Sequence, residues 1–216
     1  MTGYPGSPPL IKAALVLIDP VTNQVTSVAA LQYNPDKLTR TIQLHAVSEG
    51  TDRLEALRLK APIETIKLQA IIDAADFLEQ PEQNPAAVEH GIGPQLSALE
   101  MILYPSVARI EEVNSKAAQG ILEIAPAESP LIVFVFGRDL VAPVRITEYS
   151  VTEEEFDPRL NPIRATVSMT LRVLSSVDLP PTHRGAAIYL AYQRQRELLR
   201  TMLPNATLGQ TGINSL

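Results

Sequence analysis

Residues 150–171 read SVTEEEFDPRLNPIRATVSMTL, a cluster of acids and two prolines followed by a strictly alternating run. Because the side chains of a strand point alternately to its two faces, the alternation predicts a β-strand with one buried face and a well-defined register. The acidic part and its prolines indicate the bend of a hairpin. The apolar phase of this strand contains Ile163, Ala165, Val167, Met169, Leu171 and Val173.

Three earlier segments have the same period of two and predict further strands with one buried face. Residues 12–19 and 130–137 are apolar in both phases, as expected of central strands that are covered on both sides. The turn residues 20–24 predict that the first two strands pair as an antiparallel hairpin. The apolar phases of the three alternating segments are Val25, Ala29, Leu31 and Tyr33; Leu38, Ile42, Leu44 and Ala46; and Ile66, Leu68, Ala70 and Ile72.

Helical spacing is found in two places. In residues 94–106 it predicts one short helix between the strands, with Leu96, Leu99 and Leu103 on one face, after a loop over residues 79–94. Residues 184–203 predict a longer helix, and residues 204–216 read as a tail. Its expected stripe is Ile188, Ala191, Gln195, Leu199 and Met202, with Arg194, Arg196 and Arg200 on the polar face.

Composition excludes several classes of protein. The chain has no cysteine, so disulfides, thiolate zinc sites and a cysteine nucleophile are excluded. A formal net charge of −6 disfavours a nucleic-acid partner. The N-terminus lacks the basic and apolar regions of a signal peptide, and no apolar run approaches the ~20 residues of a membrane span. We therefore expect synthesis in the cytoplasm and no insertion into a membrane.

No motif predicts a catalytic, cofactor or metal site. In a calcium loop beginning at Asp157, Arg159 and Pro162 would replace a ligand and the required glycine, so a solvated hairpin loop is favoured. The three histidines lie far apart, and the chain contains no G-x-S-x-G, phosphate-loop or dinucleotide motif. A pair of carboxylates for glycoside cleavage stays open, because any two of the 24 acidic residues can meet in space.

Five blocks in order resemble the tube-type proteins of contractile injection systems, which are phage-tail-like machines. The likeness is to the baseplate adaptor whose relatives often carry a C-terminal LysM module. Block 31–41 is similar to the family's F-N-P-x-x-[LY] stretch, and block 64–73 to its L-x-L-x-L-x-x-D strand. The others are 12–24, the opening hairpin; 130–152, similar to P-x-V-x-F-x-W-G and its hairpin return; and 155–172, similar to F-x-x-x-G-x-P-x-R-A-x-V-x-[LM]-x-[FL].

The resemblance covers roughly residues 9–175, and this chain departs from the pattern at several positions. Tyr33 replaces the usual Phe, Phe136 replaces the Trp before Gly137, and Asn161 stands near the usual glycine. No LysM module follows, which puts contact with peptidoglycan in doubt.

The resemblance implies a tail-tube fold: two packed antiparallel sheets or a flattened β-barrel, with a flanking α-helix and a C-terminal helix. It divides the chain into a β domain at residues 1–178 and a docking extension at 179–216. The implied function is structural and not enzymatic, without a cofactor. A hexameric ring would join the inner tube to the central spike and initiate tube assembly, in a phage-tail-like particle that is either released or anchored.

Within that interpretation we expect the 151–163 hairpin and the 47–62 loop to reach adjacent subunits or the next ring. The alternative is that both fold back on their own domain. The expected ring contacts are Leu54, Leu57, Leu59, Glu153, Glu154, Phe156 and Arg159. The expected contacts of the final helix with inner tube, spike or baseplate proteins are Ile188, Tyr192, Arg196 and Leu199.

Two other classes stay open. The inner tube subunit itself would share the fold and be present in more copies. A small-ligand-binding β-barrel, or a cell-wall-acting enzyme on a β scaffold, would be a monomer with a closed apolar cavity instead of a ring with a wide wet lumen.

Overall fold

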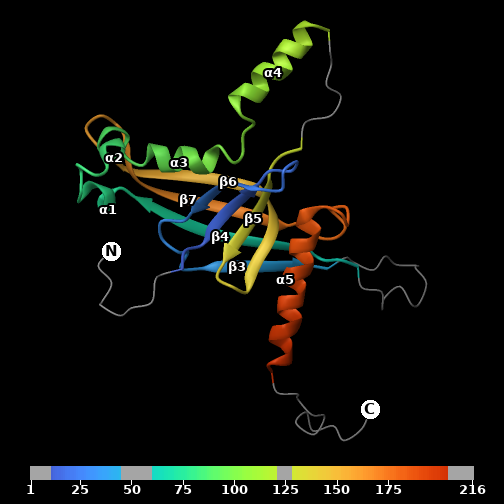
Figure 1. The fold of residues 1–216 in the computed structure, drawn as a ribbon. Coiled ribbons are helices and arrows are strands. Elements are labelled where there is room, and N and C mark those ends of the chain that lie inside the picture. Colours follow the sequence, from blue (N-terminus) through green and yellow to red (C-terminus); the bar gives the residue numbers. More distant parts are fainter. Residues whose placement is uncertain (1–10, 45–59, 121–127, 204–216) are drawn as a thin grey trace, which may run out of the picture.

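The computed structural model describes residues 11–44, 60–120 and 128–203 (Figure 1). Within these residues the protein is mainly β, with one seven-stranded antiparallel sheet and a few helices. The strands are β1 (Ala14–Ile18), β2 (Val25–Ala30), β3 (Leu38–Gln43), β4 (Ile63–Asp73), β5 (Leu131–Phe136), β6 (Leu140–Phe156) and β7 (Pro162–Val173). The helices are α1 (Ala75–Leu78), α2 (Pro85–His90), α3 (Gly93–Glu100), α4 (Val107–Ala118) and α5 (Arg184–Thr201).

The sheet has the order β2-β1-β5-β6-β7-β4-β3, and the long strand β6 joins its two halves. The first residues of β6, up to Val144, pair with β5, whereas the residues from Val144 to Phe156 pair with β7. The register shifts between Ile146 and Glu148, where the Thr147 hydroxyl donates to the Thr170 carbonyl oxygen. Because an irregularity of this kind bends a strand and increases its twist, β6 changes direction between the two halves.

Both predicted hairpins at the start and middle of the chain are confirmed. β1 pairs antiparallel with β2 through a turn in which Asn23 has φ 57°. The Asp19 carboxylate accepts the Thr22 N–H at 2.6 Å, the Thr22 hydroxyl at 3.0 Å and the Val21 N–H at 2.9 Å, and these bonds lower its pKa. β5 pairs with β6 through Gly137, whose φ of 71° suits a residue without a Cβ.

The predicted alternation of β4 and β7 is also confirmed. The four predicted residues of β4 are at most 4% exposed, and those of β7 from Ala165 to Val173 are at most 2% exposed. They pack with Leu15 of β1 and Phe134 of β5, so residues of both halves of the sheet share one hydrophobic core. Since this core draws on strands from each half, the bend at β6 allows one sheet to cover its own apolar face.

The prediction of one short helix between the strands was wrong, since the described residues contain four between β4 and β5. Residues 85–90, expected to be loop, form α2 with Pro85 at its first turn, where the missing N–H costs nothing. Leu96 and Leu99 of α3 are buried as expected, but Leu103 lies beyond the helix and is exposed. Figure 1 shows α1, α2 and α3 at the opposite end of the sheet from α5.

The junction between α2 and α3 is packed tightly against the start of β7. Gly91 has φ 59°, and a Cβ added there would lie 2.1 Å from the Pro162 carbonyl oxygen. That same oxygen accepts the N–H of Ile92 at 2.9 Å. The close approach therefore requires glycine, and it fixes the helices to the β6–β7 hairpin.

The final helix was predicted correctly in extent, but its packed face differs from the expected stripe. Gly185, Ala186 and Tyr192 are buried, and Tyr189 and Arg196 are half-buried beside them. The face that packs is rotated by about one residue from the predicted stripe, of which Ala191, Leu199 and Met202 are exposed. A Cβ at Gly185 would lie 3.1 Å from Leu131 Cδ1, so the helix begins in close contact with β5.

We predict that Gly91→Ala lowers the free energy of unfolding by about 2–4 kcal/mol, because it adds a steric clash to an unfavourable backbone conformation. Gly93→Ala is the matched control, two residues away, with only the His90 Cβ within 4 Å. It should change stability by less than about 1 kcal/mol. Urea denaturation of both variants measures the difference, and equal effects would contradict the packing argument.

Candidate functional site

The two edge strands of the sheet, β2 and β3, expose apolar side chains to solvent. Val28 is 57% and Leu44, directly after β3, is 72% exposed, and Val25 and Ile42 are also exposed. The sequence predicted one buried face for each segment, and the prediction holds only in part. Leu31 is buried and Ala29 and Leu38 pack against the core, whereas Val25, Ile42 and Leu44 of the same phases are exposed. An exposed apolar edge strand offers unpaired backbone groups to another chain. Both ends of the sheet are therefore suited to assembly.

The face of β4, β6 and β7 opposite the core is lined with hydroxyl and amide groups. The register places Lys67, Thr170 and Glu148 in one row across the sheet. The next row is Gln69, Ser168 and Ser150, and the row after that is Ile71, Thr166 and Thr152. Together with residues 33–37 and Thr39, most of these side chains line a surface concavity of about 790 Å³. This polar face is a broad hydrogen-bonding surface without a closed apolar cavity.

Several charges on the polar face are paired, although Arg145, opposite Arg172 in the register, has no ion pair within the described residues. Lys67 Nζ lies 3.9 Å from Glu148, and Arg164 Nε lies 3.8 Å from Glu154. Arg172 makes a closer ion pair, at 2.6 Å, with Asp178. Charges of both signs therefore occur on the face, which is unlike the uniformly basic surface that attracts a polyanion.

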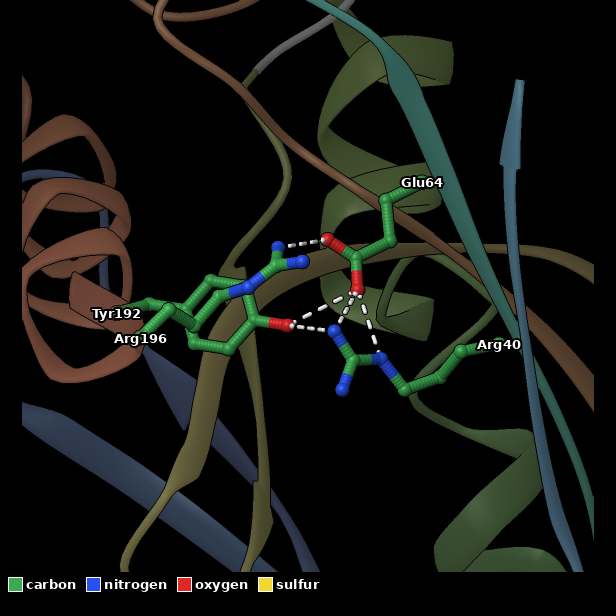
Figure 2. Close-up of polar contacts among 4 residues, drawn as sticks. All are labelled: Arg40, Glu64, Tyr192 and Arg196. Atoms are coloured by element: carbon green, nitrogen blue, oxygen red, sulfur yellow. Dashed lines mark hydrogen bonds and ion pairs between the residues drawn. The ribbon is translucent and has the colours of Figure 1, made fainter. Parts of the chain in front are cut away.

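A buried carboxylate, Glu64, lies at the start of β4 and connects three elements (Figure 2). Its Oε1 accepts bonds from Arg40 Nε of β3 and from the Tyr192 hydroxyl of α5, each at 2.9 Å. Its Oε2 accepts a bond from Arg196 of α5 at 3.0 Å. Arg40 also donates to the Tyr192 hydroxyl at 3.0 Å, so each of the four side chains in this Glu64 cluster has a polar partner within it.

The Glu64 cluster clamps the final helix to the β3 edge of the sheet. Glu64 is 5% exposed, and a buried carboxylate is tolerated because two guanidinium groups and a hydroxyl compensate its charge. The Arg196 guanidinium also lies 5.4 Å from the centre of the Tyr192 ring, a favourable cation–π distance. Burial, and then the nearby Glu64 carboxylate, raise the pKa of Tyr192 to about 12.

Sequence reasoning did not identify Glu64 or Arg40, although both carry a signal. Glu64 belongs to the same phase of β4 as Ile66 and Leu68, and Arg40 to the same phase of β3 as Ile42. A charged residue in the buried phase of a strand requires a partner, which points to a buried ion pair.

The four residues expected to dock partners lie on different sides of α5. Tyr192 and Arg196 are engaged with Glu64 of the same chain, and Tyr192 is 3% exposed. Ile188 is half-buried against the apolar cluster of Ile18, Leu131 and Val133, whereas Leu199 is exposed. Since Tyr192 belongs to the main core, the boundary expected at residue 178 separates residues that share one core. That α5 docks partner proteins stays a prediction, and among the four expected residues only Leu199 is exposed for such a contact.

The residues expected to make ring contacts at the 151–163 hairpin also differ in placement. Glu153 and Phe156 are exposed, and Glu154 is near Arg164 as described above. Arg159 donates to the Val88 carbonyl oxygen of α2 at 2.6 Å, so the tip of the hairpin folds onto its own chain. Leu54, Leu57 and Leu59 lie outside the described residues.

The acidic turn is held together by hydrogen bonds within the chain. The Asp157 carboxylate accepts bonds from the side chain and backbone of Asn161 and from the backbone of Arg159, and these bonds lower its pKa. Across residues 11–44, 60–120 and 128–203, no group of three His, Asp or Glu side chains could hold a metal ion. Within the same residues, no helix combines the length and the apolar character needed to cross a membrane.

Compared with known proteins, the chain matches no protein-family model and no curated protein.

We predict that Tyr192→Phe lowers the free energy of unfolding by about 1–3 kcal/mol, because it removes a hydroxyl bonded to a buried charge. Tyr189→Phe, one turn earlier in the same helix, is the matched control, since no hydrogen bond within the described residues involves its hydroxyl. It should change stability by less than about 0.5 kcal/mol. Urea denaturation at neutral pH distinguishes the two, and equal losses would show that Glu64 does not depend on the hydroxyl.

The raised pKa of Tyr192 also predicts alkaline behaviour. An unfolded tyrosine titrates near pH ~10, so the neutral Tyr192 hydroxyl contributes stability that is complete below that pH. The contribution is lost as the pH rises toward the folded pKa of about 12. We expect the urea midpoint of the native chain to fall more steeply between these values than that of Tyr192→Phe, with Tyr189→Phe like the native chain. Parallel curves for all three proteins would contradict the assignment.

Proposed function

We propose that the chain is a ring-forming structural component of a contractile injection system baseplate, an adaptor that joins the inner tube to the central spike and initiates tube assembly. The ordered sequence blocks suggest the family, and the mainly β antiparallel architecture is compatible with it. The role requires no catalysis and no cofactor.

The observation that carries the proposal is the exposure of apolar side chains at both edges of one sheet. Val28 belongs to β2 at one end of the strand order, and Leu44 follows β3 at the other. When the two edges of a subunit differ, copies associate head to tail, and such contacts form a closed ring if the rotation between copies closes. A ring pairs every edge and leaves none exposed.

A ring at the end of a tube encloses a channel, and the polar face is suited to line it. If copies join edge to edge, one face of every sheet is directed toward the axis. The rows of Ser, Thr and Gln side chains on β4, β6 and β7 suit a hydrated lumen, and their ion pairs leave it without a strong net charge. The opposite face is the buried core and cannot line a channel.

Ring formation gives a prediction at each edge. We expect Val28→Lys and Leu44→Lys each to reduce the ring fraction at least about tenfold, because a charge is placed in an apolar strand contact. Val21→Lys is the matched control, since Val21 is 86% exposed in the β1–β2 turn and lies outside the strand. Native mass spectrometry and electron microscopy of the full chain give the copy number and the ring fraction. A wild-type monomer at all concentrations, or rings unaffected by either edge variant, would contradict the proposal.

A further inference from the structure

The helix α4 is amphipathic and has no buried residue. It projects away from the body of the molecule, as Figure 1 shows. Val107, at 64% exposed, Ile110 and Val113 present apolar side chains to solvent. An isolated helix of twelve residues is marginally stable in water, so its apolar stripe requires a contact that the described chain does not supply.

The sequence of α4 nevertheless specifies a helix. The Ser106 side chain caps it by accepting the N–H of Arg109. Glu112 is paired with Arg109 at 2.7 Å and with Lys116 at 2.6 Å on the polar side, and both bonds lower its pKa. These local interactions are of the kind that stabilise an exposed helix surface, so the apolar side is the one left for a partner.

A second unpartnered helix face lies on α5. Its inner face is bound by the core and the Glu64 cluster, but Leu190 and Leu198 on its outer face are about half exposed. Ala187 and Ala191 are exposed on the same side. Arg194 lies between the two leucines, at helical spacing from each, and no carboxylate of the described residues pairs with it.

The two helix faces are complementary in charge. Glu111 lies one helical turn from Val107, at the margin of the α4 stripe, and no cation of the described residues pairs with it. Arg194 supplies the opposite charge within the apolar stripe of α5. In Figure 1, α4 and the C-terminal end of α5 project from opposite sides of the molecule. The two helices of one copy therefore do not meet.

We propose that α4 of one copy packs along the outer face of α5 of another copy, with Glu111 beside Arg194. The two patches are different surfaces on opposite sides of the chain, so the contact is head to tail. One pair of short helices is smaller than the ~1,200 Å² of a stable independent interface. The contact therefore rests on the proposed ring, in which copies already joined by their edges present the helices at high effective concentration.

Cysteine cross-linking tests this contact directly, because the native chain has no cysteine. Ile110→Cys and Leu198→Cys proteins with different tags are co-expressed, purified as full chains and treated with a short bismaleimide, which tolerates a wider spacing than a disulfide does. We expect a cross-linked heterodimer at least about ten times more abundant than with Glu82→Cys and Leu198→Cys. Glu82 is an exposed residue between α1 and α2.

Absence of the heterodimer, or cross-links only between two Ile110→Cys copies, would overturn the inference and assign the stripe to another partner or to a symmetric pair. The charge pair gives a second measurement in the same assay. Glu111→Arg and Arg194→Glu should each lower the heterodimer yield severalfold, and their combination should restore it. Failure of the combination to restore the yield would overturn the assignment of Glu111 to Arg194.

The two proposals fail separately. Rings of the native chain without the α4–α5 cross-link would leave the adaptor function in place and exclude this contact. Open chains or dimers that cross-link efficiently, without any ring, would support the contact and exclude the adaptor function. All five variants replace exposed side chains, and circular dichroism of each is compared with the native chain before cross-linking.

Discussion

The long strand β6 determines how the rest of the sheet is arranged. Because its first residues pair with β5 and its later residues with β7, a single run of backbone hydrogen bonds holds both halves of the sheet. The register shift between Ile146 and Glu148 bends the strand at the point where the pairing partner changes. A straight strand would place the apolar faces of the two halves side by side, whereas the bend brings Leu15 and Phe134 to the residues of β4 and β7.

The Glu64 cluster adds specificity to this apolar arrangement. Ion pairs that are buried contribute little net stability, since removing charges from water costs about as much as the pairing returns, but losing one partner is expensive. Arg40 comes from β3 and Tyr192 and Arg196 come from α5, so the carboxylate is satisfied only when both elements are in place. The position of the final helix and the position of the edge strand β3 are therefore coupled.

The sequence predicted best the strands whose alternation follows from packing against the core of the same chain. β4 and β7 alternate because one face of each is buried in the core, and Gly137 marks a turn that needs positive φ. The helix α2 was missed because Pro85 and Gly91, which begin and end it, are also loop residues. The packed face of α5 was missed because a glycine, a tyrosine and an arginine make it, so hydropathy does not show it. At β2 and β3 the alternation predicted fully buried phases, but Val25, Ile42 and Leu44 are exposed because these strands form the edges of the sheet.

Coupling between the Glu64 cluster and an edge strand has a consequence for assembly. In a ring built from edge contacts, the rotation between neighbours depends on the direction of each edge strand, and a small change in that direction opens the ring into a helix. Arg40 belongs to β3, and its guanidinium is held by Glu64 and by the Tyr192 hydroxyl. In such a ring the Glu64 cluster would contribute to ring closure without lying in the interface, because it fixes the direction of β3, the strand that would pair with the neighbouring copy.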